Sequence, residues 1–264
     1  MNGVRHFLLA LQFFTRVPVT GTLAEWVGFS PAMLRASVAH FPGVGWVVGG
    51  VAEAVFVLTH IGLSGPAGAL AAAVLSTIAT VMLTGAFHED GLADLADGLG
   101  GSYDRTRALQ IMKDSRIGAF GAIALVLALV LKITLLATLA SYGSAEVVAA
   151  LLCAHVLSRF APMLLIRSLP HVGDADGSKS KPLADAISGR ALGVGLLWSL
   201  PAVALLLNGH GVWQGLFAVL MGSLATYGMA RLLARRLGGF TGDGLGATQQ
   251  VVELAIYFAL AWRF

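Results

Sequence analysis

The sequence has one cysteine, Cys153, among its 264 residues. A single cysteine has no partner within the chain, which excludes an intrachain disulfide and a cysteine-based metal site. Charge is also scarce, because only 12% of the residues are Asp, Glu, Lys or Arg, whereas soluble domains carry about 25%. The net charge of +3 and the pI of about 9.3 reflect a small excess of bases and indicate no nucleic-acid partner.

Apolar side chains are abundant instead. They make up 57% of the residues, and the mean hydropathy of +0.81 is typical of a helical protein that crosses a membrane several times. The N-terminal stretch 1–19 is basic and then apolar, but Arg16 interrupts it and no small-residue cleavage site follows. We therefore interpret this stretch as an amphipathic interfacial helix and not as a signal peptide.

Seven apolar runs follow, at 42–61, 65–87, 118–140, 145–166, 191–208, 212–233 and 247–262. Six of them meet the roughly 20 apolar residues that a transmembrane helix needs. The seventh is short and contains Glu253, so a tilted span and a re-entrant helix both stay open. We expect an all-α, polytopic integral membrane protein with about 6–7 transmembrane helices and cytoplasmic catalytic loops. Residues 1–264 should form a single membrane-embedded domain.

The connections between the runs differ in their basic content. Short connections without Lys or Arg lie at 61–65, 140–144 and 208–211. Longer connections with several Lys or Arg residues lie at 88–117, 167–190 and 234–246. Six spans put all the longer connections on one side, together with the N-terminus. The positive-inside rule makes that side the cytoplasm.

The most acidic stretch begins where the second run ends. It contains Glu89, Asp90, Asp94 and Asp97. On a helix, the i, i+4, i+7 spacing of the three aspartates places them within an arc of about 60°. Such carboxylates repel one another, and Mg²⁺ is the cation that takes carboxylate and phosphate oxygens together. We therefore expect a metal-phosphate site; a solvated polar face is the alternative. His88, at the start of the stretch, is a candidate base, a candidate ligand or an interfacial side chain.

A basic segment follows, with Arg105, Lys113 and Arg116 near the acids. These groups bind phosphate oxygens well, although each of them could simply anchor the next span at the membrane surface. On an unbroken helix Asp114 would point away from Arg105 and Arg116. A break at Asp114–Ser115, with one of the two capping the next span, would remove this difficulty.

A glycine-rich loop precedes the seventh run. Five of the nine residues from 238 to 246 are glycine, and Thr241, Gly242 and Asp243 stand among them. The loop is neither a Walker A loop nor a Rossmann fingerprint. Beside a metal site it becomes a candidate cradle for a phosphate or a nucleotide.

Three charges fall inside the predicted spans: Glu53, Lys132 and Arg159. Charges within a membrane are costly and are normally paired. Because Glu53 and Lys132 lie at similar depth, we expect them to pair. Arg159 lies nearer the cytoplasmic end of its span and is a candidate to face the site. Loop 167–190 has the composition of a solvated connection, and it could also cover the site.

The chain resembles the cobalamin synthase family, the adenosylcobinamide-GDP ribazoletransferases. The family pattern HxDGLADxxDG matches His88–Gly98, IMKDSRIGxxG matches Ile111–Gly121, and GGxTGDxxGA matches Gly238–Ala247. The segments LQFFTRVPV, at Leu11–Val19, and FPGVG, at Phe41–Gly45, fit as well. The resemblance covers nearly the whole chain.

The resemblance implies a Mg²⁺-dependent phosphotransferase of the EC 2.7.8 class in the bacterial inner membrane, with its active site facing the cytoplasm. Its substrates would be adenosylcobinamide-GDP and α-ribazole or α-ribazole 5′-phosphate, and its products adenosylcobalamin or its 5′-phosphate and GMP. The expected metal ligands are Asp90, Asp94 and Asp97, and one of these or His88 would accept the proton. The expected substrate- and phosphate-binding residues are Arg105, Lys113, Asp114, Arg116, Thr241, Gly242 and Asp243.

Two other functions stay open. A CDP-alcohol phosphotransferase shares the opening Asp94-x2-Asp97-Gly98 of its signature, but the later residues do not follow at that family's spacing. An ion-coupled transporter would place its carboxylates near the middle of its spans, whereas these acids cluster at the predicted membrane surface. The sequence also leaves open whether the chain forms a homo-oligomer.

Overall fold

The computed structural model describes residues 2–63, 65–172 and 187–263, and these residues are almost entirely helical. Near the N-terminus lie α1 (Asn2–Phe14), α2 (Gly21–Val27), α3 (Pro31–Ser37) and the 3₁₀ helix η1 (Val38–His40). The long helices are α4 (Phe41–Gly62), α5 (Gly65–Thr84), α8 (Ala119–Tyr142), α9 (Ser144–Ser168), α10 (Gly189–His210), α11 (Val212–Leu237) and α12 (Gly242–Ala261). Two shorter helices, α6 (Phe87–Gly101) and α7 (Arg105–Ile111), stand between α5 and α8. The polytopic helical fold is thereby confirmed.

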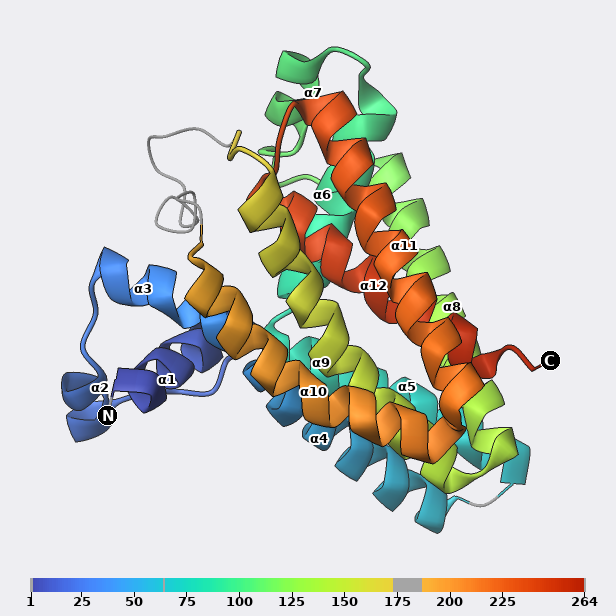
Figure 1. Ribbon diagram of the computed structural model, residues 1–264. Helices are drawn as coiled ribbons and strands as arrows, with labels where there is room; N and C mark the ends of the chain where they lie inside the picture. Colours follow the sequence, from blue (N-terminus) through green and yellow to red (C-terminus); the bar gives the residue numbers. More distant parts are fainter. Residues whose placement is uncertain (1, 64, 173–186, 264) are drawn as a thin grey trace.

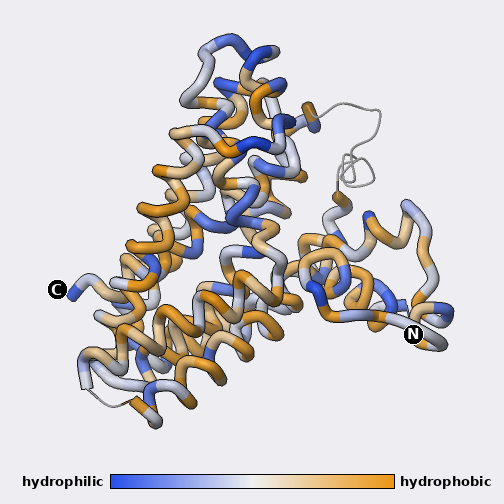
Figure 2. The backbone as a smooth tube through the Cα atoms, turned by 180° about the vertical axis from the view of Figure 1, so that it is seen from behind, coloured by the Kyte–Doolittle hydropathy of each residue, from blue (hydrophilic) through white to orange (hydrophobic). Residues whose placement is uncertain are grey.

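Six of the described helices are long and apolar enough to cross a membrane: α4 with the preceding α3 and η1, α5, α8, α9, α10 and α11. The end of α4, the α8–α9 turn and the α10–α11 turn gather at the lower right of Figure 1. Helix α7 lies at the top of Figure 1 and the N-terminal helices lie at the left; the backbone at the top of Figure 2 is rich in hydrophilic residues. The α8–α9 and α10–α11 turns therefore lie at the end of the bundle away from α7.

Helix α12, which holds the seventh apolar run, is enclosed by the others. It packs against α6, α8, α9 and α11, and Thr248, Gln249, Gln250 and Glu253 are all buried. It begins beside α6 and reaches the far end of α8, where the Tyr142 hydroxyl donates a hydrogen bond to the Ala261 carbonyl at 3.0 Å. Twenty helical residues extend about 30 Å, roughly the thickness of the hydrocarbon core. Its polar residues face neighbouring helices, and α12 is not among the six described helices that are apolar enough to cross a membrane.

Small residues let the central helices approach closely. A Cβ added to Gly45 of α4 would collide with the His155 carbonyl oxygen of α9. The two helices could therefore not keep this separation with a larger residue at Gly45. Close approach at small residues is the usual way in which helices pack in lipid, where neighbouring apolar side chains gain little from leaving the solvent.

The predicted pairing of Glu53 with Lys132 is wrong. Lys132 Nζ lies 2.7 Å from Glu253 Oε1, and the two side chains are 3% and 1% exposed. Glu53 lies on α4, which packs against α5 and α9, whereas Lys132 lies on α8, which packs against α5 and α12. Similar depth in the membrane was therefore not enough to predict an ion pair, because α4 and α8 do not pack closely against each other. Gln249 Nε2 also donates to Glu253 Oε2 at 2.7 Å.

Replacing Lys132 by Met should destabilise the protein strongly, because it leaves the Glu253 carboxylate buried without its ammonium partner. The expected loss is about 3–5 kcal/mol of unfolding free energy, measured by thermal or denaturant unfolding in detergent micelles. Combining Lys132→Met with Glu253→Gln should recover most of it. Glu53→Gln, at a half-buried site, is the matched control and should change little. A stable Lys132→Met protein together with an unstable Glu53→Gln protein would contradict the observed pairing.

Candidate active site

The acidic helix α6 begins at a sharp turn after α5. Gly85 and Ala86 both have positive φ, at 66° and 58°, and Ala86 is the helix N-cap. The left-handed conformation costs a non-glycine residue about 1–2 kcal/mol, so the surrounding contacts must hold it. One of these contacts is the backbone N–H of Arg16, which donates to the Leu83 carbonyl at 2.7 Å. The turn ends the apolar helix and lets α6 run in a new direction across α12.

Helix α6 packs directly on the first turn of α12. A Cβ on Gly91 would lie 2.8 Å from the backbone oxygen of Asp243, so the absence of a side chain sets the distance between the two helices. At the same crossing, a Cβ on Gly246 would lie 3.4 Å from the His88 Cα. The glycines of the two sequence motifs therefore lie against each other's helices. They bring Asp243 close to the aspartates of α6.

Burial raises the pKa of Asp94 to about 7, and three nearby aspartates add to the rise. In decreasing order of effect these are Asp243, Asp90 and Asp97. Burial, with the charge of Asp90, also raises the pKa of Asp243 to about 6. We call Asp90, Asp94 and Asp243 the acidic cluster. Sequence reasoning had placed Asp243 in a phosphate cradle, apart from the predicted metal ligands.

The acidic cluster has the chemistry of a divalent-cation site. Within residues 2–63, 65–172 and 187–263, no group of three or more His, Cys, Asp or Glu side chains is arranged to hold a metal ion. Mg²⁺ nevertheless takes only one or two carboxylates from most proteins and completes its shell with water and substrate phosphates. The raised pKa values of Asp94 and Asp243 mark crowded carboxylates whose ionisation a bound cation would favour. Mg²⁺ binding by these residues stays a prediction.

Asp97 stands apart from this cluster in its contacts. Its carboxylate accepts hydrogen bonds from the backbone N–H groups of Gly118, at 2.7 Å, and Gly121, at 2.8 Å. A Cβ on either glycine would collide with an Asp97 oxygen. Asp97 is thus the anion at the N-terminus of α8. These contacts give it an anchoring role, and metal binding by Asp97 stays a prediction.

The predicted break between the basic segment and the next span is confirmed. Helix α7 ends at Ile111 and α8 begins at Ala119. The α8 N-cap is Gly118, so the expectation that Asp114 or Ser115 caps this helix is wrong. Arg116 Nη2 instead donates to Asp114 Oδ2 at 2.6 Å. That contact lowers the pKa of the exposed Asp114 carboxyl to about 2.

The other basic residues lie on α7, on the segment that follows α7 and at the end of α11. The Arg105 guanidinium lies against Gly238, where an added Cβ would stand 3.2 Å from its Nη1. Lys113 and Arg116 are exposed on the segment between α7 and α8. Arg236 Nη2 donates to the carbonyls of Leu99 and Ser102, each at 2.9 Å, and so ties the end of α6 to α11. Sequence reasoning assigned Arg236 only a topological role, because nothing in its spacing pointed to α6.

The glycine loop forms the start of α12. Gly238, with φ of 77°, ends α11 in the left-handed conformation. Thr241 is the N-cap of α12, and its hydroxyl accepts a hydrogen bond from the Gly244 N–H at 3.0 Å. The Phe240 N–H donates to the Pro170 carbonyl at 2.9 Å, so the beginning of loop 167–190 covers the glycine loop. The charged residues predicted to form a solvated part of that loop, at 174–181, lie outside the described residues.

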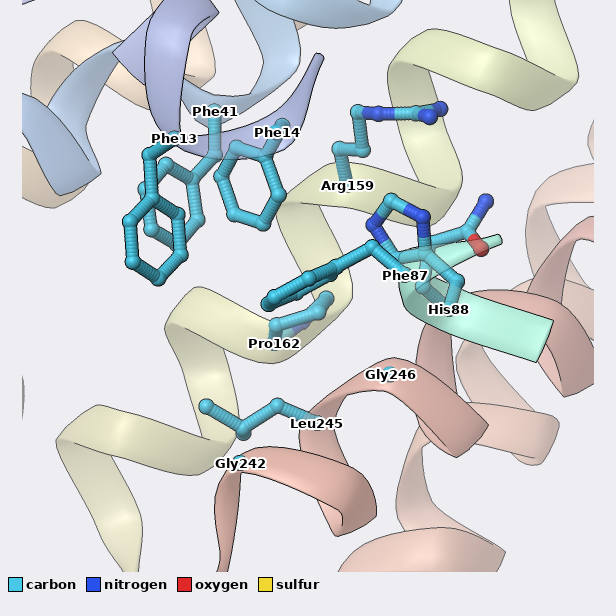
Figure 3. A pocket seen from close by; sticks show the side chains of 11 residues that line it. Phe13, Phe14, Phe41, Phe87, His88, Arg159, Pro162, Gly242, Leu245 and Gly246 are labelled. Atoms are coloured by element: carbon cyan, nitrogen blue, oxygen red, sulfur yellow. The ribbon is translucent and has the colours of Figure 1, made fainter. Parts of the chain in front are cut away.

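His88 projects to a different flank of α6 from Asp90, because residues two apart on a helix are about 200° apart. It is 4% exposed, and burial lowers its pKa. Its ring stacks on Phe14 with the ring planes 13° apart, in an apolar cavity that Arg159 also lines (Figure 3). The expectation that Arg159 faces the site, and the assignment of His88 as the base, both stay predictions.

Comparison with known proteins identifies relatives along the whole chain. A family described as cobalamin-5-phosphate synthase matches residues 6–261. The chain is 57% identical to the adenosylcobinamide-GDP ribazoletransferase of Albidiferax ferrireducens, over 98% of both chains. It is 55% identical to that of Polaromonas naphthalenivorans, over 99% of both chains. It is 44% identical to that of Vibrio cholerae, over 96% of this chain and 92% of the relative. No solved structure matches.

Replacing Asp94 by Asn should make the metal-free protein more stable at alkaline pH. The pKa of Asp94 is raised from 3.8 to about 7, so its contribution to stability is fully present below about pH 4 and is lost as the pH rises through 7. Melting in EDTA should therefore show the variant above the wild type at pH 8, with the difference shrinking toward pH 5. Glu25→Gln, at an exposed position on α2, is the control. A wild-type protein whose stability rises steadily from pH 5 to pH 8 relative to Asp94→Asn would contradict the crowding.

Asp97→Asn should destabilise the fold, whereas Asp90→Asn should not. The amide introduced by Asp97→Asn would turn an N–H toward one of the two backbone donors, which costs about 1–3 kcal/mol. Unfolding in detergent compares the two variants directly. Equal stability of both would argue against the anchoring role of Asp97.

Proposed function

The chain belongs to the cobalamin-5-phosphate synthase family, and we propose that it transfers the cobinamide phosphate of adenosylcobinamide-GDP to α-ribazole or α-ribazole 5′-phosphate. The family catalyses the nucleotide-loop assembly step of cobalamin synthesis, and the chain is a transferase of that kind. The observation that carries the proposal is the convergence of Asp90 and Asp94 with Asp243. A diphosphate substrate brings its own negative charge, so a cluster of carboxylates can bind it only through a cation.

A ribose hydroxyl of the ribazole attacks the phosphorus that carries the cobinamide arm. The new bond joins the ribose oxygen to this phosphorus, the bond from phosphorus to the bridging oxygen breaks, and GMP leaves with that oxygen. A carboxylate of the acidic cluster accepts the hydroxyl proton. This assignment is favoured over His88 because the His88 ring is packed against Phe14 on another flank of α6.

Mg²⁺ is the proposed cofactor, and Asp90, Asp94 and Asp243 are the proposed ligands. Asp97 is proposed to support them by anchoring α6 to the start of α8. When bound, it would neutralise the diphosphate and the charge that develops on the leaving GMP. Arg105, Lys113 and Arg116 lie on the segment that follows α6 and are proposed to bind the non-bridging phosphate oxygens, as guanidinium and ammonium groups do well. Thr241 and Gly242, at the start of α12, are proposed to bind a phosphate near the helix N-terminus, where the helix dipole favours an anion.

The proposed location is the bacterial inner membrane, with the acidic cluster facing the cytoplasm. The support is the positive-inside rule, because the segments that follow α5, α9 and α11 carry most of the Lys and Arg residues. A soluble nucleotide-activated substrate would then reach the site directly from the cytoplasm.

Asp90→Asn, Asp94→Asn and Asp243→Asn should each lower turnover at least about 100-fold without unfolding the protein. The measurement is GMP release by purified protein supplied with adenosylcobinamide-GDP, α-ribazole and Mg²⁺. EDTA should stop the reaction and Mg²⁺ should restore it. Asp104→Asn, at the N-cap of α7, is the control. Release of CMP from a CDP-alcohol would favour the phosphotransferase alternative, and near-normal rates in all three variants would refute the acidic cluster.

Single-cysteine labelling should reveal the orientation. In a Cys153→Ala background, Ser115→Cys should react with a membrane-impermeant maleimide only after the inner membrane is opened. Ser141→Cys, exposed at the far end of α8, should react from outside. The reverse pattern would contradict the proposed cytoplasmic site.

A further inference from the structure

A groove with a volume of about 440 Å³ runs along the bundle between α10 and α11. Figure 1 shows these two helices meeting at their turn and diverging from there, with α9 and α12 between them. The buried side chains of Leu165 on α9, and of Val252 and Ile256 on α12, form part of its floor. On α11 the lining extends from Ala218 to Ala230, which is about 18 Å of helix. Because the hydrocarbon core of a bilayer is about 30 Å thick, the α10–α11 groove has about the length of one leaflet.

The α10–α11 groove presents an apolar surface. Leu164 and Leu196 in its lining are exposed, and a continuous exposed apolar surface is typical of an interaction site. The serine and threonine hydroxyls of the lining each donate a hydrogen bond to a carbonyl of their own helix. These residues are Ser168, Ser199, Ser223 and Thr226. A hydrocarbon chain therefore leaves none of these hydroxyls without a partner.

The size of the α10–α11 groove suits a slender occupant. An α-helix with its side chains is about 10–12 Å wide, so a helical segment about 18 Å long would need roughly 1,400 Å³ or more. The groove offers about 440 Å³. An acyl chain therefore fits it better than a helix from a second copy of this chain.

Two arginines stand at one end of the α10–α11 groove. The Arg231 guanidinium lies over the ring of Tyr227, with its Cζ 5.9 Å from the ring centroid, and Tyr227 lines the groove. Arg167 directly precedes Ser168, which is the last residue of α9 and another lining residue. Both arginines are exposed. Within the part of the chain that the structure describes, neither guanidinium has an ion-pair partner.

We propose that the α10–α11 groove binds an anionic phospholipid of the surrounding bilayer, with an acyl chain along the groove and the phosphate beside Arg167 and Arg231. Guanidinium groups bind phosphate oxygens well, and basic pockets between membrane-spanning helices are typical sites for anionic headgroups. The lining contains none of the residues assigned to the proposed reaction. The inference therefore stands independently of the proposed function.

Native mass spectrometry of the purified full chain tests the headgroup preference. Phosphatidylglycerol and phosphatidylcholine with the same palmitoyl and oleoyl chains are offered in equal amounts. The wild type should retain phosphatidylglycerol about tenfold more, because each arginine favours a net negative headgroup. The double variant Arg167→Gln with Arg231→Gln should lose most of this preference. Arg263→Gln, beside Tyr142 at the far end of α8, is the matched control and should keep it.

Filling the α10–α11 groove tests the position of the acyl chain. Ser223 is exposed and lines the groove, so Ser223→Phe should place a ring in the space of the chain and lower the retention of both lipids at least about fivefold. Leu224→Phe, at an exposed position of α11 outside the lining, is the matched control and should change neither. Thermal melting of the variants shows that they are folded.

Equal retention of the two lipids by the wild type would overturn the proposal, and so would unchanged retention in Ser223→Phe. A second copy of the chain as the occupant would give a different pattern. The wild type would then be a dimer in lipid-free detergent, and Ser223→Phe would make it a monomer while lipid retention stayed the same.

Discussion

The close crossing of α6 over the first turn of α12 is the constraint on which the site depends. Gly91 allows it, because any side chain there would collide with the Asp243 backbone. The crossing brings acids from two motifs about 150 residues apart in the sequence into one electrostatic unit, and burial with mutual repulsion raises the pKa of Asp94 and Asp243. The resulting excess of negative charge has a cost in the metal-free fold. A divalent cation would remove this repulsion, and the relief would favour its binding.

The rest of the bundle keeps this crossing in place. Helix α12 is polar along one side and is therefore enclosed, with Glu253 paired to Lys132 of α8. Near the site, Gln250 Nε2 donates to Glu89 Oε1 at 3.2 Å, which links α12 to the first turn of α6. Asp97 joins the other end of α6 to α8 through two backbone N–H groups. Buried polar contacts of this kind fix the relative position of helices that apolar packing alone would leave free to slide in lipid.

Much of this organisation could be predicted from the sequence. The spans, the break after α7 and the acidic helix all follow from local patterns of hydropathy, charge and spacing. The partner of Lys132 could not be predicted, since it depends on which helices are neighbours and not on depth. The different role of Asp97, compared with Asp90 and Asp94, could not be predicted for a similar reason. Helical spacing puts all three on one face, and only the position of Gly118 and Gly121 distinguishes the anchor from the cluster.

The central claim is that Asp90, Asp94 and Asp243 act as one cation site although Asp243 belongs to a different motif. Binding of Mn²⁺, a spectroscopically visible substitute for Mg²⁺ at oxygen ligands, tests it most directly. Electron paramagnetic resonance of the purified protein, titrated with Mn²⁺ in the presence of GDP, should show tight binding by the wild type. Asp243→Asn should weaken that binding as strongly as Asp94→Asn does. Wild-type Mn²⁺ affinity in Asp243→Asn, with loss confined to the aspartates of α6, would contradict the account.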